Sequence, residues 1–395
     1  MIPEKFNREI FEFIKANESS DPFELSLRSH QFSPDIRKVI SDQVLSRQKL
    51  KKKVPSWGKF DQILLPKPVS IEQASSEITA RYKSELIQGG RILDLTGGMG
   101  VDTYFFAKKA RYVDYIEMDP DIAAIARYNF SNMDLKNVRV INQKAEEFLS
   151  SIGPDDEYDI VYVDPSRRKG SDKVFKLEDS EPNIPEIQPA LQRISRKLII
   201  KASPFLDIKY SFRQIDQLSE VHILAIDNEC KEILLVSDPS KVGDDILIST
   251  INFSRGEIQK YDSSVLKEQN SQSNYADTGR YIYDPNTAIR KAGLFHSISK
   301  DFNLNKLSSN SHLYFSDTLS RRFPGRIFEL NDRIPFHKFL KKPKYEKANI
   351  AVRNFPLTVS EIRKKSGVKE GGDLYIFGTT DHLKNAFFIL ARKID

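Results

Sequence analysis

The sequence has one cysteine among 395 residues, Cys230. A single cysteine excludes an intramolecular disulfide framework and a cysteine-based structural zinc site. No apolar run approaches the ~20 residues that cross a membrane, and residues 1–9 lack the apolar core of a signal peptide. We therefore expect a soluble, cytoplasmic protein that does not insert into a membrane.

Glycine and proline are present in ordinary amounts, and histidine is scarce. Seventeen glycines and nineteen prolines exclude a collagen-like or low-complexity chain. The six histidines show no spacing typical of metal ligands, so we expect no metal. With 39% hydrophobic residues the chain can bury a sizeable core. Its length suggests two or three domains at roughly 150 residues each.

The net charge of +6 is unevenly distributed along the chain. The balance is +4 over residues 1–60, −7 over residues 61–320 and +9 over residues 321–395. Basic ends favour a polyanionic partner such as RNA, because neutralising phosphates releases counterions. Lysine-rich ends also keep a protein in solution, so charge alone leaves both interpretations open.

Residue patterns divide the chain into four segments. Residues 1–69 carry apolar residues at helical spacing and predict an N-terminal helical segment. Residues 70–242 begin with a predicted helix over 70–87 and continue as alternating strands and helices. Residues 243–320 predict a small α+β domain, and residues 321–395 predict a further small domain with short strands.

The second segment determines the fold class. Between Arg91 and about Asp238, short apolar runs alternate with helical segments, as in a parallel sheet covered by helices. Only three residues separate the last two runs, Val221–Asp227 and Lys231–Ser237. So short a link requires an antiparallel hairpin, because a parallel crossover needs a dozen residues or more. We predict an α/β fold, a Rossmann-like sheet with an antiparallel last strand, plus N-terminal helices and small C-terminal α+β domains.

The first predicted strand ends in a glycine-rich turn. Asp94 closes the strand, and Gly98 and Gly100 follow at the spacing Asp-x-x-x-Gly-x-Gly. Glycine is needed where the backbone approaches a ligand with no side chain between them. A dinucleotide fingerprint would need a third glycine at the position of Thr103. The turn by itself therefore indicates a ligand without naming it.

The next three strand ends carry further polar chemistry. Glu117 ends the second strand, where a carboxylate can accept hydrogen bonds from both hydroxyls of a ribose, and Met118 can line an adenine ring. Ala145 and Glu146 follow the third strand and can contact the adenine edge, and Asp164 ends the fourth. Parallel sheets bind ligands at the carboxyl ends of their strands, so we expect these residues at one edge.

Together these residues resemble a class I S-adenosylmethionine-dependent methyltransferase over about residues 71–238. Asp94 with the turn Gly97–Gly100 resembles its first motif, Glu117 its ribose-binding acid, and Asp164-Pro165 its catalytic fourth motif. The resemblance implies S-adenosylmethionine as the cofactor. The cofactor-binding residues that it implies are Asp94, Thr96, Gly97, Gly98, Gly100, Asp102, Thr103, Glu117, Met118, Ala145 and Glu146.

Further motifs resemble a bacterial group of these enzymes that carries a ferredoxin-like insert and a C-terminal THUMP-like domain. The motifs are Gln73–Glu77, Gly100–Thr103, Asp164–Arg168, Val352–Leu357 and Lys369–Asp373. Related enzymes include cap-guanine N2 methyltransferases, and THUMP domains are associated with RNA binding. The resemblance thus implies methylation of an exocyclic amine of a base in RNA. The substrate-binding residues that it implies are Ser76, Glu77, Lys201 and Arg353.

The implied reaction is a direct displacement at the methyl group of the cofactor. Asp164 and the Pro165 carbonyl would orient the amine, and Arg167 and Arg168 would hold a phosphate or stack on a base. Methylation at carbon 5 of a pyrimidine is set aside, because it needs a cysteine nucleophile and Cys230 lies in the predicted hairpin turn.

Two alternatives stay open. Amine-directed enzymes usually carry a second proline and an aromatic residue where this sequence has Ser166 and Arg167, which favours a protein or small molecule as acceptor. The second alternative is a non-catalytic RNA-binding protein with a vestigial cofactor pocket, against which the intact motif residues argue. Basic residues interleaved with aromatics in residues 321–326 and 338–347 suit an RNA surface and equally a solvated face.

Overall fold

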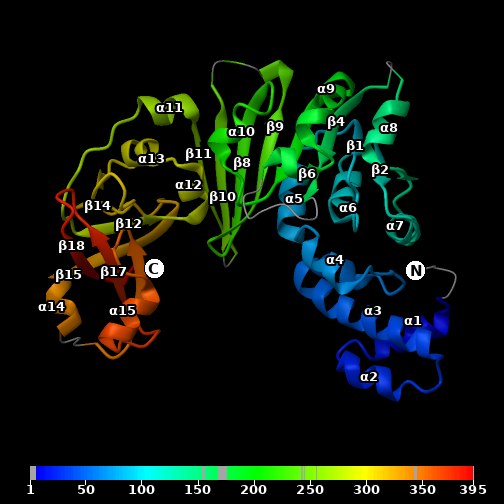
Figure 1. Ribbon diagram of the computed structural model, residues 1–395, viewed down its shortest axis with the longest axis horizontal. Helices are drawn as coiled ribbons and strands as arrows, with labels where there is room; N and C mark the ends of the chain where they lie inside the picture. Colours follow the sequence, from blue (N-terminus) through cyan, green and yellow to red (C-terminus); the bar gives the residue numbers. More distant parts are fainter. Residues whose placement is uncertain are drawn as a thin grey trace. The chain divides into compact units, whose positions relative to one another are not determined.

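A computed structural model describes residues 6–153, 156–167, 176–241, 243, 245–254, 256–341 and 345–394 (Figure 1). The chain divides into two compact units. The first contains Met1–Ser219 and Leu234–Val242, and the second contains Glu220–Ile233 and Gly243–Asp395. Each unit has apolar core clusters of its own.

The first unit begins with helices, as the sequence predicts. They are α1 (Arg8–Ala16), α2 (Pro22–Arg28), α3 (Pro34–Lys53), η2 (Pro55–Lys59), α4 (Pro68–Gln73) and α5 (Glu77–Glu85). A proline occupies the first turn of α2, α3, η2 and α4, where the missing N–H would have no intrahelical partner anyway. The starts of these helices are therefore specified locally.

The single helix predicted over 70–87 is wrong, because the structure has two helices there. Between α4 and α5 the backbone of Ala74 is extended, with ψ 159°. The Ser76 side chain then accepts a hydrogen bond from the Thr79 N–H at 3.3 Å and caps α5. A serine side chain is more favourable at a helix start, where it accepts a hydrogen bond from a free N–H, than in a helix interior. The break separates Gln73–Ser75 from both helices.

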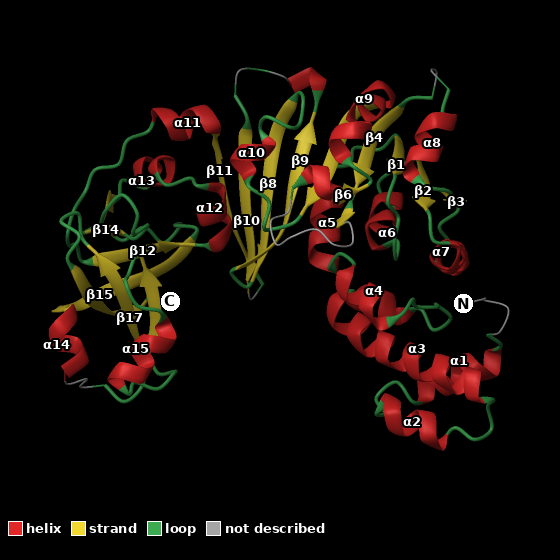
Figure 2. Cartoon of the chain, in the orientation of Figure 1, coloured by secondary structure: helices red, strands yellow, loops and turns green. Residues whose placement is uncertain are grey.

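The first unit continues as a parallel sheet with intervening helices (Figure 2). Its strands lie in the order β9-β7-β4-β1-β2-β3, and β7, β4, β1, β2 and β3 are parallel. The strands are β1 (Arg91–Asp94), β2 (Tyr112–Glu117), β3 (Val138–Asn142), β4 (Tyr158–Val163), β7 (Ser195–Ala202) and β9 (Glu229–Ser237). The helices are α6 (Val101–Ala107), α7 (Pro120–Asn132), α8 (Ala145–Ser151), α9 (Ile184–Ile194) and α10 (Ile208–Ser211). A short pair, β5 (Ser166–Arg167) and β6 (Ser180–Glu181), follows β4. The predicted Rossmann-like sheet is confirmed.

The predicted hairpin is confirmed as well. The strands β8 (Leu218–Ile226) and β9 are neighbours in the sheet and are separated by two residues. These are Asp227 and Asn228, with φ of 48° and 63°. Asp and Asn tolerate the left-handed conformation that such a two-residue turn requires. Beyond β8 the sheet continues with a parallel β10 (Leu247–Ser254) and an antiparallel β11 (Glu257–Ser264).

A second sheet of seven strands completes the second unit. Its order is β13-β14-β12-β15-β18-β17-β16. The strands are β12 (Tyr281–Pro285), β13 (Asn305–Lys306), β14 (Tyr314–Ser316), β15 (Gly325–Pro335), β16 (Asn349–Arg353), β17 (Leu374–Thr380) and β18 (Ala386–Lys393). The helices are α11 (Val265–Asn270), α12 (Thr287–Ala292), α13 (His296–Asp301), α14 (Phe336–Lys341) and α15 (Val359–Ser366). The segments 243–320 and 321–395 thus contribute strands to one sheet, through the antiparallel pairing of β12 with β15.

The link between α3 and α4 is fixed to the first unit by two buried carboxamides. Asn129 accepts from the Leu64 N–H at 2.8 Å and donates to the Leu64 carbonyl at 2.7 Å. Gln43 accepts from the Leu65 N–H at 3.0 Å and donates to the Leu65 carbonyl at 2.6 Å. Nearby, Leu65 belongs to one apolar cluster with residues of the glycine turn and α6. The N-terminal helices therefore share a core with the sheet.

Candidate active site

A cavity of about 530 Å³ lies at the carboxyl ends of β1, β2 and β4 in the first unit. Most of the residues predicted to bind the cofactor line it. They are Asp94, Thr96, Gly97, Gly98, Gly100, Asp102, Glu117, Met118, Ala145 and Glu146, together with Asp164 and Lys201. The side chains predicted from four separate strand ends are therefore brought together at one edge of the sheet.

The structure places the other predicted residues elsewhere. Thr103 and Pro165 are buried beside the cavity without lining it. Ser76 caps α5, and Glu77 accepts hydrogen bonds from the Ser56 N–H and from Arg81, so these two act within the fold. Arg353 belongs to the second unit. The side chain of Arg167 and the whole of Arg168 lie outside the described part of the chain.

The glycine turn allows close packing beneath the cavity. A Cβ atom at Gly97 would lie 2.1 Å from the ring of Tyr115. The hydroxyl of the same tyrosine donates to the Gly98 carbonyl at 2.5 Å. Gly98 has φ +54°, and a Cβ there would meet only the Thr96 carbonyl, at 3.9 Å, so the space beside it is open. The turn thus combines a fixed backbone with room for a ligand.

We expect Gly97→Ala to weaken cofactor binding at least tenfold, corresponding to about 1.4 kcal/mol. The added methyl group displaces the Tyr115 ring and with it the backbone of the turn, an overpacking that costs roughly 1–3 kcal/mol of stability. Titration calorimetry with S-adenosylmethionine and thermal unfolding measure both effects. Gly58→Ala is the matched control, since nothing lies within 4 Å of a Cβ at Gly58. Equal affinity of the two variants would contradict the prediction.

The carboxylates of Asp94 and Glu117 fix the glycine turn through hydrogen bonds. Asp94 accepts from the Thr103 hydroxyl at 2.5 Å and from the Thr96 N–H at 3.3 Å. Glu117 accepts from the Gly98 N–H at 2.8 Å through one oxygen and from the Asp119 N–H at 2.8 Å through the other. Burial raises the pKa of Glu117. Burial, helped by the charges of Asp102 and Asp164, raises the pKa of Asp94 to about 7.

The raised pKa of Asp94 predicts a pH-dependent stability of the unliganded protein. A carboxyl whose pKa is higher in the folded state stabilises that state most at low pH. Its contribution is complete below the ordinary pKa of 3.8 and is lost as pH rises through about 7. The loss amounts to up to about 4 kcal/mol. We therefore expect Asp94→Asn to gain stability relative to wild type between pH 4 and 8, as measured by urea unfolding.

The exposed Glu147→Gln is the control for this pH series, because it removes a carboxylate from the neighbouring α8. If the difference in stability between Asp94→Asn and wild type stays constant over the same pH range, Asp94 does not titrate in this way.

A buried polar network that the sequence did not reveal lies behind the cavity. Lys83 is 1% exposed, and its Nζ lies 2.9 Å from a carboxylate oxygen of Asp102. The other Asp102 oxygen accepts from the Ser75 hydroxyl at 2.7 Å and from the Tyr162 hydroxyl at 3.0 Å. Burial alone would raise the pKa of Asp102, but the charges of Lys83 and Lys201 outweigh it and lower that pKa. The network fixes the cavity wall formed by Ser75, Asp102 and Tyr162.

Asp164 lies at the cavity edge with its side chain 31% exposed. Its backbone N–H donates to the Thr96 hydroxyl at 2.6 Å, which links the end of β4 to the glycine turn. One of its carboxylate oxygens accepts from Lys201 Nζ at 2.5 Å. The other oxygen has no hydrogen-bond partner within the described ranges. Because Lys201 binds only one of the two oxygens, the other can accept a hydrogen bond from the molecule that is to be methylated.

Other lining residues were not predicted as site residues. Gln73, Ser75, Gln143, Lys144, Ser166, Glu181 and Pro182 line the cavity. Gln73 and Ser75 belong to the sequence motif Gln73–Glu77, and the helix break at Ala74 turns them, rather than Ser76 and Glu77, to the cavity. Glu181 and Pro182 reach it because β6 pairs with β5 directly after Asp164-Pro165. That pairing joins residues 15 positions apart and has no local signal in the sequence.

The described residues contain no group of histidine, cysteine or acidic side chains arranged to hold a metal ion. Within the same ranges, no helix is both long and apolar enough to cross a membrane. A second cavity, of about 620 Å³, lies in the second unit, and none of the predicted site residues lines it.

Comparison with known proteins agrees with this geometry. Residues 63–181 match the family described as conserved hypothetical protein 95, residues 281–324 match a ferredoxin-like domain, and residues 325–393 match a THUMP domain-like family. A crystal structure assigned as a methyltransferase from Porphyromonas gingivalis is 30% identical to this chain. It covers 100% of both chains with a TM-score of 0.91.

Two curated relatives match shorter parts of the chain. An uncharacterised S-adenosylmethionine-dependent methyltransferase of Mycobacterium tuberculosis is 22% identical over 275 residues, which are 68% of this chain and 69% of the relative. A protein named as a cobalt-precorrin-6B C(15)-methyltransferase of Methanobrevibacter smithii is 31% identical over 103 residues, 26% of this chain and 53% of its own length.

The sheet and the cavity at its carboxyl edge define an S-adenosylmethionine-dependent methyltransferase of class I. Within that class, the chain belongs to the family that carries a ferredoxin-like and a THUMP-like domain, as the sequence motifs implied. The protein is therefore an enzyme, and a vestigial, non-catalytic pocket is not supported.

The cavity fits the cofactor of this class. The open side of Gly98 leaves space beside the turn. Glu117 offers a carboxylate at the position expected for the ribose hydroxyls, and Met118 is 55% exposed at the cavity, as expected for a residue that lines an adenine ring. Asp94 and Glu117 place acidic side chains at the cavity, which suits a ligand that carries a sulfonium and an ammonium group. The exact contacts of each predicted cofactor residue stay predictions.

Proposed function

We propose that this protein methylates an exocyclic amine of a base in RNA. The observation that carries the proposal is the Asp164 carboxylate at the edge of the cofactor cavity, where Lys201 occupies one oxygen and leaves the other to an acceptor. The strand-end motif Asp164-Pro165 resembles that of amine-directed methyltransferases. The basic balance of +9 over residues 321–395, in the THUMP-like part, supports an RNA acceptor.

The cofactor supplies a methyl group that its sulfonium has already activated toward nucleophiles. The chain therefore mainly positions the acceptor. The open oxygen of Asp164 accepts an N–H bond from the amine, which turns the nitrogen lone pair toward the methyl group. The Pro165 carbonyl accepts the second N–H bond. After transfer, the carboxylate accepts the surplus proton or passes it to water.

The remaining residues position the cofactor and the acceptor relative to each other. Asp94 and Glu117 fix the glycine turn against the cofactor through the hydrogen bonds described above. The link from the Asp164 N–H to Thr96 couples the acceptor side of the cavity to the cofactor side at 2.6 Å. Arg167 and Arg168 hold a phosphate of the acceptor or stack on its base.

A small molecule or a protein is the second candidate acceptor. Ser166 and Arg167 stand where amine-directed nucleic-acid enzymes usually have proline and an aromatic residue. The similarity to a protein named as a precorrin methyltransferase, over 26% of this chain, also favours a small molecule.

The test is transfer of labelled methyl from S-adenosylmethionine to total RNA, protein or small-molecule extract from a strain that lacks the gene. We expect label in RNA, and none with the Asp164→Ala variant. Label in protein or small molecules alone would overturn the RNA acceptor and support the second candidate. Nuclease digestion of labelled RNA then distinguishes a methylated amine from other modified positions.

A further inference from the structure

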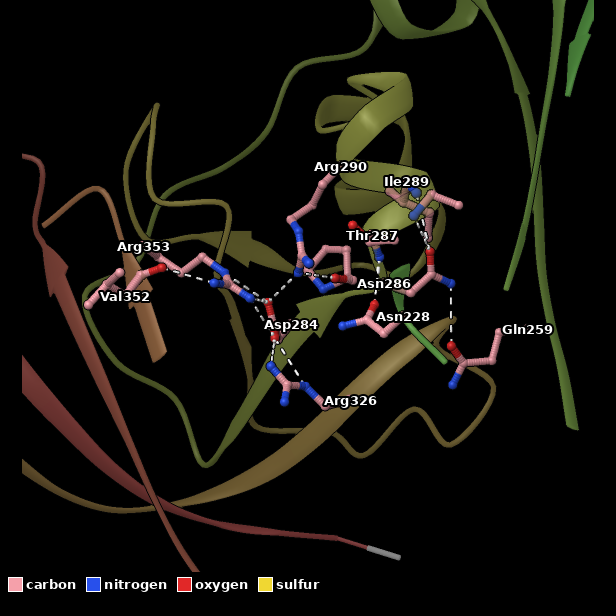
Figure 3. Close-up of polar contacts among 12 residues, drawn as sticks. Asn228, Gln259, Asp284, Asn286, Thr287, Ile289, Arg290, Arg326, Val352 and Arg353 are labelled. Atoms are coloured by element: carbon pink, nitrogen blue, oxygen red, sulfur yellow. Dashed lines mark hydrogen bonds and ion pairs between the residues drawn. The ribbon is translucent and has the colours of Figure 1, made fainter. Parts of the chain in front are cut away.

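Three arginines surround one buried aspartate in the second unit (Figure 3). Asp284 lies on β12, and its side chain is 0% exposed. Arg290 comes from α12, Arg326 from β15 and Arg353 from the end of β16. The cluster therefore combines residues of the ferredoxin-like match with residues of the THUMP-like match.

Both carboxylate oxygens of Asp284 are saturated by these arginines. Arg353 donates from Nε and Nη2 to Oδ1 at 3.1 and 2.9 Å, and from Nη2 to Oδ2 at 3.0 Å. Arg326 donates from Nη2 and Nε to Oδ2 at 2.6 and 3.3 Å. Arg290 donates from Nη1 to Oδ1 at 3.2 Å and to the Pro285 carbonyl at 2.7 Å. The three guanidinium groups therefore converge on this one aspartate.

The charges of this cluster do not balance. Three guanidinium groups share one carboxylate, and within the described ranges no other acidic side chain forms an ion pair with them. Two positive charges are left without a counterion. In the same unit, Arg280 forms an ion pair with one acid, Glu329, and Arg333 with one acid, Asp381.

The surplus charge is only partly exposed to water. The side chains of Arg290, Arg326 and Arg353 are 23%, 34% and 18% exposed. Half-buried charges are costly unless a partner of opposite sign neutralises them. Nη1 of Arg326 and Nη2 of Arg290 make no hydrogen bond with any residue that the structure describes, so donors remain for a ligand.

The pKa values of neighbouring groups reflect the positive charge of this cluster. Burial, together with the charges of Lys306, Arg353 and Arg290, lowers the pKa of His312 to about 4. Burial would also raise the pKa of Asp284, but the charges of Arg353, Arg326 and Arg290 outweigh it and lower that pKa.

We propose that Arg290, Arg326 and Arg353 form a binding site for a phosphate group, with Asp284 as the residue that positions them. Planar guanidinium groups match the oxygens of a phosphate in pairs, and a dianion would neutralise the two surplus charges. Under the proposed function, on which this assignment of the ligand rests, the phosphate belongs to the backbone of the RNA acceptor. Free phosphate is the other source of the same chemistry.

The test uses the full chain and compares Arg326→Gln and Arg290→Gln with Arg280→Gln. The last variant is the matched control, because it removes a guanidinium that Glu329 already neutralises. Binding of a fluorescent single-stranded RNA is measured over a salt series, and thermal unfolding is measured in inorganic phosphate and in chloride at equal ionic strength. Titration with S-adenosylmethionine shows for each variant that the first unit is folded.

We expect Arg326→Gln and Arg290→Gln each to weaken RNA binding about tenfold and to reduce the salt slope by about 0.7, the value for one phosphate contact on a single strand. Wild type should melt about 2 °C higher in phosphate than in chloride, and both variants should lose this difference. Arg280→Gln should behave as wild type.

Two outcomes separate the site from the function. If the wild type binds no RNA but the variants abolish stabilisation by phosphate, the site is supported and the RNA acceptor is refuted. If Arg326→Gln and Arg290→Gln match Arg280→Gln in RNA binding and in phosphate stabilisation, the proposed site is overturned.

Discussion

Asp164→Asn should lower the rate of methyl transfer by about 10²–10³-fold, within the range that one positioned acid–base group contributes. The substitution keeps the shape of the side chain and its place beside Thr96, but it removes the carboxylate charge that faces the acceptor. Cofactor binding should change less than about threefold, which is under 1 kcal/mol, because the Asp164 side chain contacts Lys201 rather than the glycine turn. Single-turnover transfer and calorimetric titration measure the two quantities.

The control for this variant is Glu147→Gln, which removes an exposed carboxylate from α8 and leaves the cavity lining intact. If Asp164→Asn transfers methyl groups as fast as Glu147→Gln, Asp164 does not orient the acceptor. If instead both transfer and cofactor affinity fall together, Asp164 shapes the cofactor site, and the proposed role in orienting the amine is wrong.

Lys83→Met should destabilise the protein by about 3–5 kcal/mol, which lowers the melting temperature by roughly 10 °C. The methionine fills similar space, but it leaves the buried carboxylate of Asp102 without the ammonium group 2.9 Å away. Removing one partner of a buried ion pair costs more than the pair itself contributes, because the remaining charge stays out of water. Differential scanning calorimetry at neutral pH gives the change.

A surface ion pair is the comparison. Lys109 lies 3.5 Å from Glu85, with side chains 46% and 67% exposed, so Lys109→Met should cost at most about 1 kcal/mol. Adding Asp102→Asn to Lys83→Met should restore part of the lost stability, since the unpaired charge is then gone. Melting temperatures of Lys83→Met and Lys109→Met within about 2 °C of each other would contradict the prediction.

The sequence predicts the sheet and the strand-end residues because both depend on short-range patterns. Alternating apolar runs identify the strands, and residues such as Glu117 and Asp164 follow them directly. Since parallel strands share one carboxyl edge, four local observations become one site without any knowledge of long-range contacts. The hairpin at Asp227 and Asn228 is predictable for the same reason, because the length of the link determines the strand direction.

Residues that act through distant partners are not predictable in this way. In the sequence, Lys83 looks like a surface lysine on an amphipathic helix. It becomes a buried cation only because the fold brings it to Asp102, which lies 19 residues further along the chain. The helix break at Ala74 shifts the cavity lining from Ser76 and Glu77 to Gln73 and Ser75. Arg353 was predicted at the substrate, and its ion pair with Asp284, 69 residues away, has no local sign either.

The carboxamide pairs at Leu64 and Leu65 have a consequence for producing the enzyme in pieces. A fragment beginning at residue 70 would leave Asn129, which is 1% exposed, without the Leu64 N–H and carbonyl that it binds. Each orphaned polar group costs about 1–3 kcal/mol. The same cut uncovers Met99 and Tyr104 beside the cofactor turn. Such a fragment should therefore aggregate on expression, and a shortened enzyme has to retain the N-terminal helices.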